Sequence, residues 1–184
     1  MNPVLVEAHR GNTLESAHRG ALAVVDSRGG VVLALGDTQR PVFPRSAVKL
    51  LQALPLVASG AADALALNDE ELALACASHN GEPAHVATAA GMLAKAGVDA
   101  RVLECGVHWP YREAFQREMA ARGETPSALH NNCSGKHAGF ICLACHRAGS
   151  TPLRDFVRGY VRPEHAVMRE VSQALQASTG WDLA

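Results

Sequence analysis

A serine and a lysine stand three positions apart in the segment Ser46-Ala47-Val48-Lys49. Residues at that spacing share one face of an α-helix, so we expect the Ser46 hydroxyl and the Lys49 amine within hydrogen-bond reach. A serine becomes a nucleophile when a base takes its proton, and a lysine in apolar surroundings can be that base because burial favours the neutral amine. The alternative is a helix-capping serine beside a solvated lysine.

A second polar segment, Ser78-His79-Asn80-Gly81, follows an apolar helical run and places a hydroxyl, an imidazole and an amide in one loop. Loops of this kind often carry active-site residues. Ser78 can shuttle a proton or hold a substrate amide, and Asn80 is a candidate for substrate binding. The alternative is an ordinary polar turn, because Asn-Gly is a frequent turn dipeptide.

A third polar segment, from His130 to His137, precedes another apolar helical run and contains Cys133 and Lys136. One cysteine and one histidine make only half of a tetrahedral metal site, so further ligands would have to come from elsewhere. Gly135-Lys136 resembles part of a phosphate-binding loop, but the required Ser or Thr after the lysine is missing, which excludes nucleotide binding here. The alternative is a capped helix start with a buried thiol.

The segment Cys142-Leu143-Ala144-Cys145-His146 matches the attachment signature of a c-type haem. Both cysteines also belong to a continuous helical apolar pattern, and aromatic residues make up only 4% of the chain. We therefore expect Cys142 and Cys145 to be buried, reduced and free of haem.

The helices and strands that must position these residues are predicted from the spacing of apolar residues and from Gly, Pro and helix-capping residues. Apolar runs at 4–9, 21–26 and 31–36 predict strands, and the last two form an antiparallel hairpin around a Gly-containing turn. A helical period starts near Ser46, with a kink or early stop expected at Pro55. Further helices are predicted at 69–77 after an Asn68 cap, 83–96, 111–121, 134–148 and 163–178. The fold class is therefore α+β.

Composition narrows the function classes. The 184 residues are 48% hydrophobic, which excludes wholesale disorder, and carry 17 basic and 18 acidic side chains for a net charge of −1. That balance argues against nucleic acid or a membrane as the main partner. Five irregularly spaced cysteines do not form a disulfide framework, and no secretory segment or long apolar stretch is visible. We expect a cytoplasmic protein.

The chain resembles the asparaginase II family of amidohydrolases along essentially its whole length. The resemblance rests on five blocks that occur in order: Glu15 to Gly20, Val42 to Leu56, Glu70 to Pro83, Leu103 to Pro110, and His130 to Gly139.

The resemblance implies a fold like that of serine β-lactamases and glutaminases, with an antiparallel sheet flanked by helices. It implies that Ser46 is the nucleophile, that Lys49 is its base and that Ser78 belongs to a second serine–lysine pair. Arg45 and His137 would line the substrate pocket, and we expect Asn80, from the second polar segment, to bind substrate with them. Family members can hold zinc through a cysteine and a lysine, which match Cys133 and Lys136.

Family members are considerably longer, and their C-terminal part supplies a further zinc cysteine, the lysine of the second pair and sheet strands. We therefore expect residues 1–184 to be the N-terminal portion of a single asparaginase II-like domain, with a fold incomplete at the C-terminus and little activity as a lone monomer. The expected reaction is hydrolysis of L-asparagine to L-aspartate and ammonia, and a homodimer is the expected assembly. The alternatives are a serine amidase for another amide, such as glutamine or a lactam, and a non-catalytic zinc-binding remnant.

Overall fold

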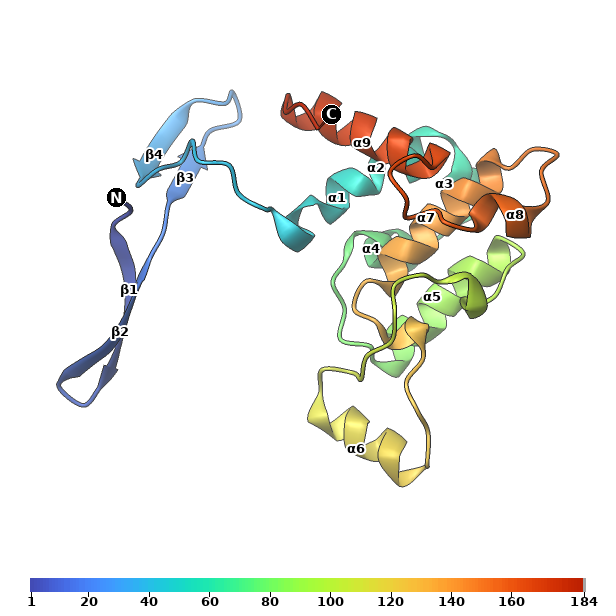
Figure 1. The fold of residues 1–184 in the computed structure, drawn as a ribbon, viewed down its shortest axis with the longest axis horizontal. Coiled ribbons are helices and arrows are strands. Elements are labelled where there is room, and N and C mark those ends of the chain that lie inside the picture. The colour runs from blue at the N-terminus through green and yellow to red at the C-terminus, as the bar shows by residue number, and fades with distance from the viewer. Residues whose placement is uncertain (184) are drawn as a thin grey trace. The chain divides into compact units, whose positions relative to one another are not determined.

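The computed structural model describes residues 1–183, and the chain divides into two units, Met1–Phe43 and a helical unit that begins at Pro44. The first unit contains two antiparallel hairpins (Figure 1). Its strands are β1 (Val4–Arg10), β2 (Thr13–Arg19), β3 (Leu22–Val25) and β4 (Val31–Leu35). Strand β1 pairs with β2, and β3 pairs with β4.

The predicted hairpin between 21–26 and 31–36 is confirmed. Its turn is held by Asp26, whose Oδ1 accepts the backbone N–H groups of Arg28 at 2.8 Å and Gly30 at 2.7 Å. Gly29 has φ +81°, a value that glycine adopts without steric cost. The sequence did not predict β2, which has only one apolar side chain larger than alanine, Leu14.

The strands form two separate two-stranded sheets, and the single antiparallel sheet expected from the sequence is not what the described residues show. Strands β3 and β4 are exposed along their whole length, with Val31 66% and Val32 69% exposed. The antiparallel pairing is confirmed, and the flanking of a sheet by helices stays a prediction. The class is α+β.

The core of the helical unit is built around α7 (Ser134–Arg147), most of whose side chains are buried. Figure 1 shows this helix, in orange, beside α4 (Asp69–Cys76) and α5 (Pro83–Lys95), both of which pack against it. Gly135 lets α7 lie close against α4, because a Cβ at that position would run into the carbonyl oxygen of Leu74. The remaining elements are η1 (Arg45–Val48), α1 (Lys49–Gln52), α2 (Leu54–Ala58), α3 (Ala61–Ala64), η2 (Ala100–Val102), α6 (Glu113–Ala121), η3 (Ala128–His130), α8 (Leu153–Val157) and α9 (Ala166–Thr179).

The helix starts predicted at Asn68 and at Pro83 are found in the structure. Asn68 caps α4 through a hydrogen bond from the Glu71 N–H at 2.9 Å, and the Glu71 carboxylate accepts the Asn68 N–H at 2.8 Å. This reciprocal capping box satisfies two backbone donors that would otherwise lack partners. Pro83 stands in the first turn of α5. The helix that starts near Ser46 is interrupted at Ala53, two residues before Pro55, as the proline predicted.

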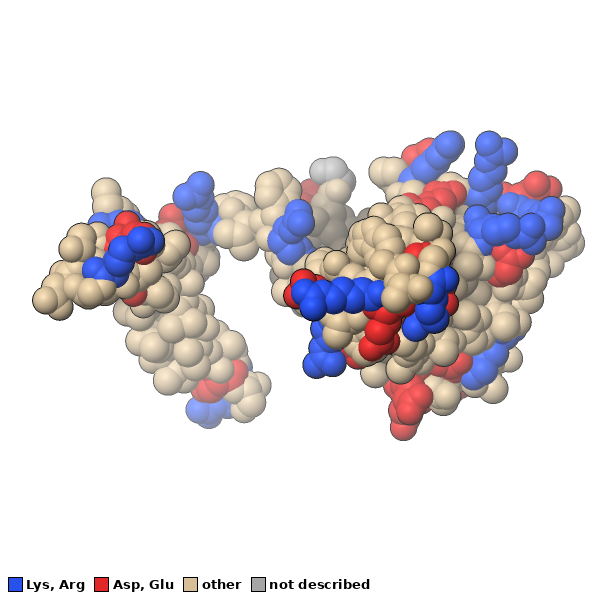
Figure 2. Space-filling view, turned by 90° about the horizontal axis from the view of Figure 1, so that it is seen from below, with Lys and Arg blue, Asp and Glu red and all other residues tan. Residues whose placement is uncertain are grey.

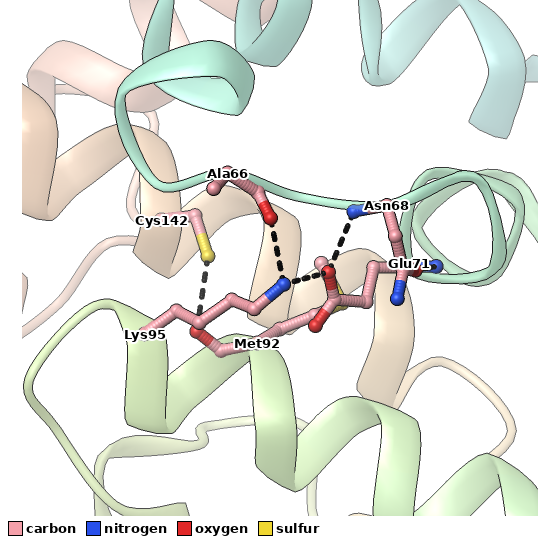
Figure 3. Close-up of polar contacts among 6 residues, drawn as sticks. All are labelled: Ala66, Asn68, Glu71, Met92, Lys95 and Cys142. Atoms are coloured by element: carbon pink, nitrogen blue, oxygen red, sulfur yellow. Dashed lines mark hydrogen bonds and ion pairs between the residues drawn. The ribbon is translucent and has the colours of Figure 1, made fainter.

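A polar cluster around the buried Glu71 carboxylate holds α4 against α5 (Figure 3). The Lys95 ammonium donates to Glu71 Oε2 at 2.6 Å and to the Ala66 carbonyl at 2.7 Å. Glu71 is 4% exposed, so its charge depends on Lys95 and on the capping N–H for compensation. In the same view the thiol of Cys142, on α7, points to the Met92 carbonyl at 3.5 Å.

Charges on the surface are mixed in sign. Figure 2 shows Lys and Arg side chains interspersed with Asp and Glu on the displayed face of the helical unit. Several exposed arginines pair locally, such as Arg122 with Glu124 at 2.7 Å and Arg147 with Glu170 at 3.0 Å. Among residues 1–183, no helix is long and apolar enough to cross a membrane.

Candidate active site

Lys49 occupies the centre of the candidate site. It begins α1, and its side chain is buried, with only 3% of the residue exposed. The amine donates to the hydroxyl oxygen of Ser78 at 2.7 Å and to the carbonyl of Ala77 at 2.8 Å. Ala77 and Ser78 directly follow α4, so these two hydrogen bonds join the start of α1 to the end of α4.

Ser46 lies one turn before Lys49 and is exposed. The helical turn Arg45–Val48 is a 3-10 helix, and α-helical geometry starts only at Lys49. The structure shows no hydrogen bond between Ser46 and the Lys49 amine, and the serine bonded to the amine is Ser78. Arg45, which precedes the exposed serine, is also exposed and has φ +53°, a strained value for a residue with a side chain.

His79 anchors the loop that carries Ser78. Its Nδ1 accepts the Gly81 N–H at 3.1 Å, so the ring proton lies on Nε2 and is donated to Ser134 Oγ at 2.9 Å. The Ser134 hydroxyl in turn donates to the Leu129 carbonyl at 2.8 Å. Burial lowers the pKa of His79 to about 4, and the nearby His85 and Lys49 side chains act in the same direction. This network ties the second polar segment to the start of α7.

Asn80 is exposed beside Ser78, and its carbonyl accepts the Tyr111 N–H at 3.0 Å. Gly81 has φ +72°, and a Cβ there would stand 2.6 Å from the His130 carbonyl oxygen. The turn therefore needs glycine for its backbone conformation and for this close approach. His108 Nε2 accepts the Asn132 N–H at 2.7 Å. Three of the sequence blocks thus meet at the site.

His137 is buried on the first turn of α7, and its Nδ1 lies 2.7 Å from the hydroxyl oxygen of Tyr160. Burial lowers the pKa of His137 to about 3, and the Lys136 and Lys49 side chains act in the same direction. Nothing in the sequence indicated Tyr160, which lies outside every polar segment and every recognised block.

Cys133 and Lys136 are both half-buried at the start of α7. The Lys136 amine lies 5.4 Å from the centroid of the Phe140 ring. Burial lowers the pKa of Lys136, while the neighbouring Cys133 side chain acts in the opposite direction. Cys105 stands near the same pair, and burial raises the pKa of its thiol to about 11.

The described residues do not make a complete zinc site. Cys133 and Lys136 supply two donors, and a tetrahedral structural site needs four. Within the part of the chain that the structure describes, no group of three or more His, Cys, Asp or Glu side chains is placed to hold a metal ion. We therefore derive no catalytic step through zinc.

The two cysteines of the haem-like signature lie on α7. Cys142 is fully buried, and burial raises the pKa of its thiol to about 12. Cys145 is half-buried, and burial raises the pKa of its thiol as well. All five cysteines are free thiols in the structure as described. The predicted burial is confirmed for Cys142 and is partial for Cys145.

A cavity of about 490 Å³ lies elsewhere in the helical unit, lined by the segment after α5, η2 and α8. Arg101, Arg154 and Arg158 contribute to its walls, and Asp99 pairs with Arg101. None of its lining residues belongs to the predicted site. The chemistry is therefore assigned from hydrogen bonding around Lys49 and not from cavity size.

A comparison with curated proteins gave no match. A family model described as L-asparaginase II matches residues 6–184, nearly the whole chain. The match includes both helix starts that carry Lys49 and Lys136, and the loop that carries Ser78. On this match, the chain belongs to the L-asparaginase II family.

Proposed function

We propose that the chain is an amidohydrolase that converts L-asparagine to L-aspartate and ammonia through an acyl-serine intermediate. Membership of the L-asparaginase II family supports the reaction class. The observation that carries the proposal is the buried Lys49 amine bonded to the Ser78 hydroxyl at 2.7 Å, because a buried amine next to a hydroxyl is a proton-transfer pair.

Ser46 is the proposed nucleophile. Its side chain is exposed at the edge of the site, one helical turn before Lys49, and a substrate can reach it. Its oxygen bonds to the amide carbon, its proton passes to the Lys49 amine, and the backbone N–H of Ser46 is the candidate donor to the oxyanion. Collapse of the tetrahedral intermediate breaks the carbon–nitrogen bond and releases ammonia, which takes the proton from Lys49. Water then hydrolyses the ester.

Ser78 is the proposed proton relay. Its hydroxyl already shares a hydrogen bond with Lys49, and it is exposed on the same loop as Asn80. Arg45, Asn80 and His137 are the proposed substrate-binding residues. A guanidinium suits a carboxylate, and the Asn80 amide offers both a donor and an acceptor to an amino acid.

Zinc is a separate proposal for Cys133 and Lys136. Their positions one turn apart on α7 support it, because both side chains can share a face. A lysine binds a metal only as the neutral amine, and burial of Lys136 favours that form.

The fold family, the cellular compartment and the oligomeric state of the protein are also proposals. A buried lysine at the start of a helical segment in an α+β chain supports a serine β-lactamase-like fold. Five free cysteines support a reducing compartment such as the cytoplasm. The exposed valines of β3 and β4 support association with a second copy in a homodimer.

The test is ammonia release from L-asparagine, with L-glutamine as the competing substrate. Ser46→Ala is compared with Ser150→Ala, a matched exposed serine outside the site. We expect release from L-asparagine in the wild type and the Ser150 variant, and its loss in the Ser46 variant. If Ser46→Ala releases ammonia as fast as the wild type, Ser46 is not the nucleophile. If ammonia is released faster from L-glutamine than from L-asparagine, the proposed substrate is wrong.

A further inference from the structure

We infer that Tyr160 is a positioning residue that fixes the ring tautomer of His137, so that Nε2–H is presented as a hydrogen-bond donor to an oxygen of the substrate. The tautomer follows from contacts within the chain. Only the step to the substrate oxygen rests on the proposed function.

The hydroxyl of Tyr160 stands between two partners. The residue is fully buried, and its oxygen lies 2.7 Å from His137 Nδ1 and accepts the Glu104 N–H at 3.0 Å. Among the described residues His137 Nδ1 is the one acceptor within hydrogen-bond distance of the phenol proton. If Nδ1 carried the ring proton instead, that phenol proton would be buried without a partner, which is costly. The phenol therefore donates to Nδ1, and a neutral imidazole then carries its proton on Nε2.

The segment that carries Tyr160 is itself held in place. Glu104 bonds to it twice, since its N–H reaches the phenol oxygen and its Oε1 accepts the Gly159 N–H at 2.8 Å. The imidazole also packs edge-on against two rings, with centroid distances of 5.6 Å to Tyr160 and 6.0 Å to Phe140. These contacts fix the orientation of the ring as well as its tautomer.

The other ring nitrogen is open to a ligand. The structure shows no hydrogen bond at His137 Nε2. Every fully buried side-chain nitrogen or oxygen of the described residues has a hydrogen-bond partner, so Nε2 is not fully buried and is accessible. His137 lies on the same first turn of α7 as Ser134, whose hydroxyl is bonded to His79, the residue after Ser78. The free donor thus belongs to the same site as the Lys49–Ser78 pair.

A fixed N–H donor has a consequence for specificity. It favours an acceptor, such as the carboxylate or the amide oxygen of L-asparagine, and it disfavours the ammonium group or an amide NH₂ at the same place. Loss of the Tyr160 hydroxyl lets the proton move to Nδ1, which would turn Nε2 into an acceptor. Tyr160 would then act on substrate binding without contacting the substrate.

The experiment records ¹⁵N–¹H correlation spectra of the histidine rings at about pH 8, where an ordinary histidine is neutral. His137 is assigned from the spectrum of His137→Gln, and no substrate is present. We expect the Nε2–H pattern for His137 in the wild type and a mixed or Nδ1–H pattern in Tyr160→Phe, with His108 unchanged in both. An Nδ1–H pattern in the wild type, or an unaltered pattern in the variant, overturns the inference.

Enzyme kinetics on the same variant test the second part of the inference, that His137 Nε2–H donates to an oxygen of the substrate. We expect Tyr160→Phe to raise KM for L-asparagine about tenfold with a smaller change in kcat, since one positioned hydrogen bond is lost. Tyr111→Phe, at an exposed tyrosine, is the matched control. An unchanged KM alongside a shifted tautomer overturns the role in substrate binding. If L-asparagine is not hydrolysed at all, the proposed function fails while the spectra still decide the tautomer.

Discussion

The Lys49 amine and the Ser78 hydroxyl oxygen lie 2.7 Å apart, although the two residues are 29 positions apart in the sequence. The contact joins the Ser-x-x-Lys segment to the polar loop after α4. The proton-transfer pair therefore depends on how α1 packs against α4, and not on local helix geometry alone.

Replacing Lys49 should abolish turnover without unfolding the protein. In Lys49→Met the length of the side chain is kept and the base is lost, and we expect the rate of ammonia release to fall at least about 100-fold. Lys49→Arg should not restore it, because a guanidinium stays protonated. Lys95→Met is the matched control, since that lysine is bound to Glu71 away from the site. Normal rates in Lys49→Met would remove this lysine from the mechanism.

The Lys95–Glu71 pair should contribute to stability and not to catalysis. Lys95→Met leaves the buried Glu71 carboxylate without its ammonium partner, and we expect the free energy of unfolding to fall by about 1–3 kcal/mol in urea titrations. Adding Glu71→Gln should recover part of the loss, because the unpaired charge is then gone. Equal stability of the wild type and Lys95→Met would show that the attraction within the ion pair only offsets the free energy lost by desolvating its charges.

Two glycines on neighbouring helices should respond oppositely to alanine. At Gly135 a Cβ would run into the Leu74 backbone, so Gly135→Ala should destabilise the protein by about 1–3 kcal/mol through forced separation of α4 and α7. At Gly91, on α5, the nearest atom is Glu71 Oε1 at 3.6 Å, an ordinary contact, and alanine should stabilise by about 0.5–1 kcal/mol. Thermal melts of both variants decide the matter. Similar shifts of the two melting temperatures would contradict the close packing at Gly135.

Stability should fall as the pH is lowered below neutrality. The pKa of His79 is lowered to about 4 and that of His137 to about 3, while an unfolded histidine titrates near about 6.5. Between about pH 6.5 and about pH 4 the unfolded chain binds more protons than the native one. The free energy of unfolding should therefore drop, by at most about 1.4 kcal/mol per pH unit for each histidine. Urea titrations across this range measure the slope, and His79→Gln should flatten it. A stability that stays level or rises towards pH 4 would contradict the burial of both rings.

Zinc uptake should depend on pH if Lys136 is a ligand. Burial lowers the pKa of Lys136, but the amine must still lose its proton to bind, so zinc content should rise between about pH 6 and about pH 9. With two donors in the described chain we expect less than one zinc per chain by elemental analysis. Cys133→Ala and Lys136→Met should each lower it further. Stoichiometric zinc at every pH and in both variants would exclude the two residues as ligands.

Local features of the fold could be predicted from the sequence because their causes are local. The Asn68 cap, the start of α5 at Pro83 and the hairpin around Gly29 each depend on residues a few positions apart. Strand β2 was missed because its alternation is polar, and its position is set by pairing with β1.

Long-range features of the site could not be predicted in the same way. The choice of Ser78 as the partner of the Lys49 amine depends on the packing of α1 against α4. Tyr160 reaches His137 across 23 positions from a segment with no recognisable motif. Such contacts arise only when the helices are assembled around α7.

The central claim is that Ser46 carries the acyl group. The most direct measurement mixes the protein with L-asparagine, quenches it in acid within the first turnover and maps the modified peptide by mass spectrometry. We predict an aspartyl adduct on the peptide that contains Ser46, and we expect it to be absent in Ser46→Ala and strongly reduced in Lys49→Met, because Lys49 takes the serine proton. An adduct on the peptide that contains Ser78, or ammonia release with no adduct on either serine, would contradict the account.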